Sequence, residues 1–212
     1  MDKKEKKLTF AEQKRKENFE RICEKMEQKG YVKRDLTVSV LQANIMAVMI
    51  MLPFAAVVFG LFCAVNPIDS IDFSISGRGG IMFLIELLLL TVLHEAIHGM
   101  AWGIFAKGHR NAIAFGVMWE TLTPYCTCME PLMKWQYVAG AAMPVLITGF
   151  GLAVITIIIG NFWILVLSEI MILSGGGDFF IILKTLLSKP RNNDVFYYDH
   201  PYECGVVAFE KK

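Results

Sequence analysis

The sequence carries little charge for its length. Of its 212 residues, 19% are charged and 55% are hydrophobic, and the formal net charge is only +1. The mean hydropathy of +0.47 excludes an ordinary soluble domain. Nucleic acid is not an expected partner, because binding it needs a concentrated basic surface. The first 38 residues hold 12 Lys and Arg, but 8 acidic residues dilute them.

Long apolar runs account for the high hydropathy. They cover about 39–65, 80–106, 137–159 and 162–187, and each is long enough to cross a bilayer, which takes about 20 apolar residues. The sequence therefore predicts a mainly α, polytopic membrane protein with four transmembrane helices and the lipid bilayer as its surroundings. We expect a cytosolic N-terminal helical segment over 1–38, a four-helix transmembrane domain over 39–188 and a cytosolic C-terminal tail over 189–212.

The basic residues are distributed unevenly around these runs. Of the 21 Lys and Arg, 20 lie in 1–38, in 107–136 or from 184 onward, and only Arg78 lies between the first two runs. By the positive-inside rule, both termini and the 107–136 segment are expected in the cytoplasm. Four of the five cysteines fall on that reducing side, so a disulfide framework is not expected. The pair Cys126 and Cys128 is either two thiols in a strand or loop, or a soft metal site.

Two segments outside the runs have their own patterns. Residues 112–130 are rich in β-branched and aromatic side chains, contain Gly116 and Pro124, and are too polar for a fifth span. They predict a short β-hairpin or re-entrant sheet between the second and third membrane helices. Residues in the first segment recur at helical spacing, with Phe19, Ile22 and Met26 on one stripe. This helix either packs on its own domain or lies on the membrane surface, attracted to anionic lipid.

The second run contains the stretch LHEAIHG. His94 and His98 stand four residues apart, so a helix presents both imidazoles on one face, where they can bind one zinc ion. Glu95, beside the first histidine, is placed as the general base. Ionisable groups at bilayer depth cost about 2.5–3.5 kcal/mol each and usually mark function. The alternative is that these side chains only form hydrogen bonds with other helices.

Catalytic zinc normally has three protein ligands, so a third is needed. Four acidic residues lie within the runs: Glu86, Glu95, Glu169 and Asp178. Asp178 lies near the cytoplasmic end, at a depth similar to that of the two histidines, whereas Glu86 and Glu169 lie nearer the outer ends and suit interfacial or interhelical contacts.

Asp178 also follows three glycines, Gly175–Gly177, which let a backbone approach closely. We therefore expect one zinc per chain, bound by His94, His98 and Asp178 with one coordination position open. The alternative for Asp178 is a helix N-cap. His109 and His200 are expected at the surface.

HEAIHG in a membrane helix, followed by Gly-Asp in the last one, resembles the intramembrane zinc metalloproteases of the site-2 protease type. With KGYVKRDLTVSVLQANI, CMEPLMKWQYVAGAAMPV, SGGGDFF and YDHPYECG, the chain more closely resembles small bacterial membrane proteins grouped as putative zincin peptidases. The resemblance implies that His94, His98 and Asp178 bind zinc, that Glu95 activates water, and that the partner is a protein or peptide substrate. It also implies a multi-pass protein of a bacterial cell membrane.

Three functions fit these patterns. The first is a membrane-embedded zinc metalloprotease. The second is a zinc transporter, because HExxH also occurs on metal-binding helices of some transporters, although four spans are few for a transport pathway. The third is a proteolytically silent membrane scaffold that regulates a partner through its N-terminal helix.

Overall fold

The computed structural model describes residues 10–212 except 119–122, 191 and 202. Its fold is mainly helical and polytopic, as predicted. Four stretches are helical, long and apolar enough to cross a membrane. They are α2 (Val40–Val65), α3 (Gly77–Phe105), a third stretch over Lys134–Ile159 and a fourth over Phe162–Leu187.

The third and fourth stretches are each divided. The third consists of α4 (Lys134–Pro144), a π-helical segment η3 (Val145–Gly151) and α5 (Leu152–Ile159). The fourth consists of α6 (Phe162–Ser174) and α7 (Gly176–Leu187). Side chains cap three of the helices at their N-termini. Ser39 and Ser76 each accept one backbone N–H bond before α2 and α3, and Asn161 accepts two before α6.

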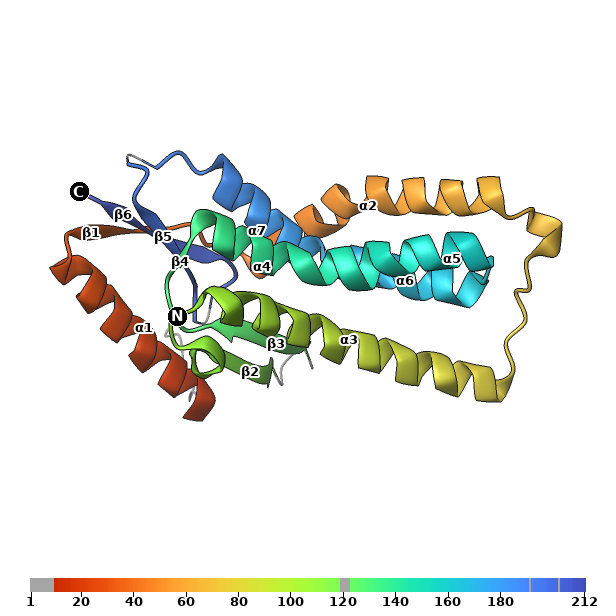
Figure 1. Cartoon of the computed structure of the whole chain (residues 1–212), viewed down its shortest axis with the longest axis horizontal. Coiled ribbons are helices and arrows are strands. Elements are labelled where there is room, and N and C mark those ends of the chain that lie inside the picture. The colour runs from red at the N-terminus through yellow and green to blue at the C-terminus, as the bar shows by residue number, and fades with distance from the viewer. Residues whose placement is uncertain (1–9, 119–122, 191, 202) are drawn as a thin grey trace, which may run out of the picture.

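The four stretches run along the long axis of the molecule, with α2 and α3 on opposite sides of the other two (Figure 1). Helix α2 packs on α6 and α7, and α3 packs mainly on α4. An apolar core joins α2 to the third and fourth stretches; it includes Met51, Phe62, Val145, Leu165 and Ile172. Most other large apolar side chains of these helices are exposed, as expected where lipid replaces water.

One end of the helices carries the β-structure. A four-stranded antiparallel sheet has the order β1-β6-β5-β4. Its strands are β1 (Tyr31–Asp35), β4 (Leu132–Met133), β5 (Val195–Asp199) and β6 (Val206–Lys211). Strands β5 and β6 lie in the segment that the sequence suggested as a tail. Their side chains are largely buried, so this segment is part of the folded core.

Helix α1 (Phe10–Gln28) covers this sheet. Phe19 and Met26 pack in one cluster with Tyr198, Val207 and Phe209, so the apolar stripe of α1 contacts the protein's own sheet. Of the cytosolic segment predicted over 1–38, residues 1–9 lie outside the described residues. The expectation that α1 packs on its own domain agrees with this cluster.

The predicted hairpin is present. Strands β2 (Ile113–Met118) and β3 (Thr123–Cys128) pair antiparallel, between α3 and α4 in the chain. A short 3₁₀ turn, η2 (His109–Ala112), connects α3 to β2, and another, η1 (Ile68–Ser70), lies between α2 and α3. The hairpin packs along α3, where a side chain at Gly99 would meet the rings and methyls of Phe115 and Ile113.

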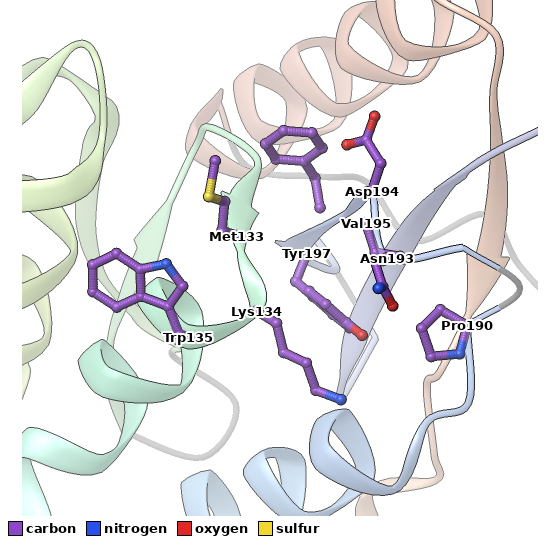
Figure 2. Close-up of a pocket in the computed structure, with 9 residues that line it drawn as sticks. Met133, Lys134, Trp135, Pro190, Asn193, Asp194, Val195 and Tyr197 are labelled. Carbon is purple, nitrogen blue, oxygen red and sulfur yellow. The ribbon is translucent and has the colours of Figure 1, made fainter.

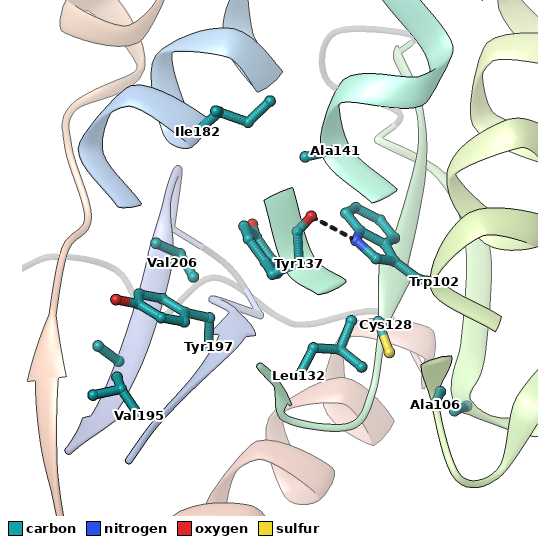
Figure 3. Packing of buried hydrophobic residues seen from close by; sticks show 12 residues of the cluster. Trp102, Ala106, Cys128, Leu132, Tyr137, Ala141, Ile182, Val195, Tyr197 and Val206 are labelled. Carbon is teal, nitrogen blue, oxygen red and sulfur yellow. Dashed lines mark hydrogen bonds between the residues drawn. The ribbon is translucent and has the colours of Figure 1, made fainter. Parts of the chain in front are cut away.

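The membrane-type helices and the sheet share a second core (Figure 3). Trp102 of α3 donates its indole N–H to the carbonyl of Tyr137 at 3.1 Å, and Tyr137 faces the sheet residue Tyr197. Leu132 and Ile182 complete the contact from β4 and α7. This core fixes α3, α4 and α7 relative to one another at the depth where the candidate site lies.

Candidate metal centre

Helix α3 presents the two histidines on one buried face. His94 and His98 are 6% and 3% exposed, and their ring centroids lie 5.0 Å apart. Positions four residues apart stack along one side of an α-helix, as the sequence spacing predicts. Glu95, one residue on, is partly buried and points around the helix from this pair.

Asp178 meets both histidines from another helix. Its Oδ2 lies 3.2 Å from His94 Nε2 and 3.3 Å from His98 Nε2. The three side chains offer ligand atoms that all lie within 4.8 Å of one another, and theirs is the one metal-type cluster of three or more His, Cys, Asp or Glu among the described residues. The structure thus brings together the three ligands that the sequence suggested, although 80 residues separate His98 from Asp178.

The N-cap alternative for Asp178 is wrong. Helix α7 begins at Gly176 with Gly175 as its N-cap, and Asp178 lies in the first turn of the helix. The glycine two residues earlier allows this placement: a Cβ on Gly176 would lie 2.6 Å from the carbonyl oxygen of Ala47 in α2. Only a residue without a side chain lets α7 approach the α2 backbone this closely.

A backbone carbonyl orients His98. Its Nδ1 lies 3.0 Å from the carbonyl oxygen of Gly140 in α4. Because a carbonyl can only accept, Nδ1 carries a proton, and Nε2 is then directed toward the Asp178 carboxylate. His98 Nε2 and Asp178 Oδ2 lie only 3.3 Å apart, and both can accept, so a cation must lie between them, either a proton or a metal ion. The indole of Trp102 stacks on the other side of this imidazole, at 4.8 Å between centroids and 13° between planes.

His94 has a similar, longer contact in the π-helical segment. Thr148 donates its hydroxyl to the carbonyl of Pro144 at 2.8 Å, which leaves its oxygen to accept from His94 Nδ1 at 3.5 Å. Both histidines therefore direct Nε2 toward Asp178. Metal-binding histidines ordinarily donate their second ring N–H in this way, so the donor set fits a divalent metal such as zinc.

Glu95 contacts the hairpin instead of the ligand cluster. Its carboxylate accepts a hydrogen bond from the backbone N–H of Cys126 in β3. The N–H of Cys128, two residues on, reaches the carboxylate of Asp199 at 3.3 Å. Since alternate residues of a strand direct their N–H groups to the same edge, the outer edge of β3 faces Glu95.

Asp199 joins three parts of the molecule around the site. It belongs to β5 and accepts from the Tyr137 hydroxyl in α4 at 2.6 Å and from Thr127 and Cys128 in β3 at 3.0 and 3.3 Å. Burial raises the pKa of Asp199, and these hydrogen bonds oppose that effect. The carboxylate thereby fixes the hairpin relative to α4, the helix whose Gly140 carbonyl orients His98. This role was not predicted from the sequence, in which the place of Asp199 within YDHPYECG is its only signal.

The two cysteines of β3 are structural. Cys126 and Cys128 lie in a strand, as the simpler expectation had it, and both are free thiols. Burial raises the pKa of both, that of Cys128 to about 12. Neither belongs to a metal-type cluster of three or more such side chains in the described part of the chain.

The other residues considered from sequence lie outside the cluster. Glu86 is exposed on α3, and a carboxylate oxygen of Glu169 is buried without a hydrogen-bond partner among the described residues. His109 is exposed in η2, as expected. His200 is only partly exposed, because its ring packs on Phe19 at 5.3 Å between centroids.

Comparison with known proteins then identifies the family. A family model described as "Putative zincin peptidase" matches residues 87–193. The chain belongs to this family. The match covers the part of α3 that holds His94, Glu95 and His98, the hairpin, and the part of α7 that holds Asp178. No curated protein and no solved structure matches the chain.

Proposed function

We propose that the protein is a membrane-embedded zinc metalloprotease that cleaves a membrane or membrane-proximal protein. The observation that carries the proposal is the convergence of His94 Nε2, His98 Nε2 and Asp178 Oδ2 beside Glu95, in a chain of the zincin peptidase family. The three side chains would hold one zinc ion per chain and leave a coordination position for substrate or water.

In this proposal, different residues hold the metal, transfer the proton and orient the histidines. Bound zinc supplies a Lewis acid that polarises the scissile carbonyl and makes water acidic enough to attack near neutral pH. Glu95 accepts the proton of the attacking water and then delivers it to the leaving nitrogen. Gly140 and Thr148 hold the two imidazoles in the tautomer that binds metal. The half-buried setting of Glu95 between α3 and β3 limits access of bulk water.

The hairpin supplies a place for an extended substrate. The outer edge of β3 faces Glu95, so a peptide added to this edge as a further strand would bring its peptide bonds alongside the base. Such a strand would compete with Glu95 for the N–H of Cys126 and would release the carboxylate as it binds. With both termini in the cytoplasm, as the distribution of basic residues favours, cleavage would take place near the cytoplasmic face of a cell membrane.

Glu95→Gln tests the proposal. The amide keeps the size of the side chain but cannot accept the proton, so the purified variant should bind zinc like the wild type and lose peptide cleavage. Glu86→Gln is the matched control, because Glu86 is an exposed carboxylate on the same helix outside the cluster. Cleavage by Glu95→Gln at the wild-type rate would refute the role of the base.

The same preparations separate the two other functions that the sequence allows. A zinc transporter would move zinc into proteoliposomes without cleaving any peptide. A scaffold would show neither activity, and removing residues 1–30 would abolish its action on a partner while leaving the metal centre intact.

A further inference from the structure

A second site lies between the N-terminal helix and the hairpin. Here a cavity of about 340 Å³ is lined by Lys14 and Arg15 of α1, by Arg110 and Asn111 of η2, and by residues of β2 and β3 that include Phe115 and Tyr125. None of these residues belongs to the metal centre.

The polar lining of this cavity is cationic. It contains Lys14, Arg15 and Arg110, and none of the described lining residues is acidic. In the described part of the chain, none of the three forms an ion pair with an acidic residue. The guanidinium of Arg15 is held over the ring of Tyr125, 4.3 Å from its centroid. Its Nε is buried without a hydrogen-bond partner among the described residues, so within that part of the chain this donor is left for an additional acceptor.

A second cavity differs from this one in its charge. The cavity in Figure 2, about 380 Å³, lies between the start of α4 and β5 and also has charged walls. There, however, Lys134 donates to the carbonyl of Leu186 and Asp194 accepts from the hydroxyl of Tyr31. Its two charged residues have opposite signs and each has a hydrogen-bond partner, whereas the charged residues described around Arg15 are all cations.

The cationic cavity lies at the level where the membrane-type helices end. Phe105, the last residue of α3, packs edge-on against Trp135 at the start of α4, 4.8 Å between centroids. Aromatic side chains at helix ends are typical of the headgroup region. Arg110 follows five residues after Phe105. Ile104, directly before Phe105, is 71% exposed, and Phe115 of the cavity lining is 59% exposed. An apolar surface suited to acyl chains therefore adjoins the three cations.

We propose that this cavity binds the phosphate of an anionic phospholipid on the cytoplasmic side of the membrane. Guanidinium groups match phosphate oxygens with paired hydrogen bonds, and the exposed Phe115 and Ile104 would contact the lipid tails. A free phosphate ion would use the cations but not this apolar surface. The bound headgroup would link α1 to η2 and so hold α1 across the hairpin, as its position beside β2 in Figure 1 allows.

Lipid titration of the full-length protein tests the inference. The detergent-purified protein is titrated with phosphatidylglycerol, with phosphatidylcholine and with inorganic phosphate, and bound molecules are counted by native mass spectrometry. We expect phosphatidylglycerol to bind more tightly than the other two. Arg110→Gln and Arg15→Gln should each weaken its binding about fivefold, the usual contribution of one basic residue near an anionic membrane surface. Lys25→Gln is the matched control, because Lys25 is an exposed residue of α1 outside the cavity.

Arg110→Gln is the deciding variant. Arg15→Gln also removes the contact with Tyr125 and can disturb the packing of α1, whereas Arg110 is exposed and its loss leaves that contact in place. Unchanged phosphatidylglycerol binding in Arg110→Gln would overturn the proposal. So would equal binding of phosphatidylcholine, which indicates tail contacts alone, or full competition by inorganic phosphate, which indicates an ion site. Displacement of bound lipid by an acidic peptide at lower concentration than by phosphatidylglycerol would identify a protein ligand instead.

Discussion

Gly176 and Gly177 form a natural pair for testing how the fold positions Asp178. Both lie in the first turn of α7, next to the candidate ligand. A Cβ on Gly176 would stand 2.6 Å from the carbonyl oxygen of Ala47 and 2.9 Å from its Cα, whereas a Cβ on Gly177 would have nothing within 4 Å. Gly176→Ala and Gly177→Ala should therefore change helix propensity by similar amounts, but only Gly176→Ala should create a clash.

The size of the effect follows from these distances. To bring the Gly176→Ala contact from 2.6 Å to the 3.4 Å at which ordinary contact begins, α7 and the α2 backbone must separate by about 0.8 Å. Overpacking of this kind costs about 1–3 kcal/mol. Gly177→Ala should instead stabilise the helix by up to about 1 kcal/mol. A shift of this size also exceeds the roughly 0.5 Å within which a binding constellation must be held, so Gly176→Ala should lose zinc as well.

Thermal unfolding in detergent and zinc content per chain measure both effects. We expect Gly176→Ala to melt below the wild type and to retain less zinc, and Gly177→Ala to melt at or slightly above the wild type with its zinc unchanged. The combined gap of about 1–4 kcal/mol corresponds to roughly 2–16 °C for a chain of this length. Equal melting temperatures for the two variants would refute the close approach of α7 to α2. Equal zinc content with different melting temperatures would refute its link to Asp178.

Three further predictions concern the groups around the site. Asp178→Ala should reduce the zinc content from near one per chain to near zero by elemental analysis, whereas Glu169→Ala, in the same span but outside the cluster, should retain it. Gly140→Ala should displace the indole of Trp102, which lies within 2.7 Å of the added Cβ, and lower zinc affinity without removing a ligand; unchanged affinity in a competition titration would contradict this. Asp199→Asn should destabilise the protein by about 1–3 kcal/mol, because it weakens three hydrogen bonds to a partly buried carboxylate. Burial raises the pKa of this group from 3.8, so the stabilisation linked to its titration is complete below pH 3.8 and is lost as the pH rises through the raised pKa. The difference in melting temperature between wild type and Asp199→Asn should therefore narrow as the pH rises through that range. A difference that widens as the pH rises would contradict the raised pKa of Asp199.

Several features could be predicted because they depend on neighbours in the sequence. Long apolar runs predicted the four membrane-type helices, and the composition of residues 112–130 predicted the hairpin. The spacing of His94 and His98 predicted their common face, since helical geometry alone brings residues four apart together. The depth of Asp178, together with the three glycines before it, indicated a third ligand that the structure places beside them.

Other features had no local signal. The C-terminal segment is short and polar at its start, and its strands β5 and β6 become recognisable only through their pairing with β1 and β4. The π-helical segment that brings Thr148 near His94 could not be read from a continuous apolar run. The charges of the cavity beside α1 come from two segments almost a hundred residues apart.

Sequence alone therefore determined which helices form and which face of α3 carries the histidines. Tertiary structure decided which groups surround those histidines. The carboxylate of Asp178 lies beside both rings, and the carbonyl of Gly140 sets the tautomer of His98. Asp199 holds the hairpin beside Glu95. The physical reason is the range of the interactions. Helix formation and amphipathic pattern depend on residues within a few positions, whereas a buried polar group finds its partners wherever the packed chain places them.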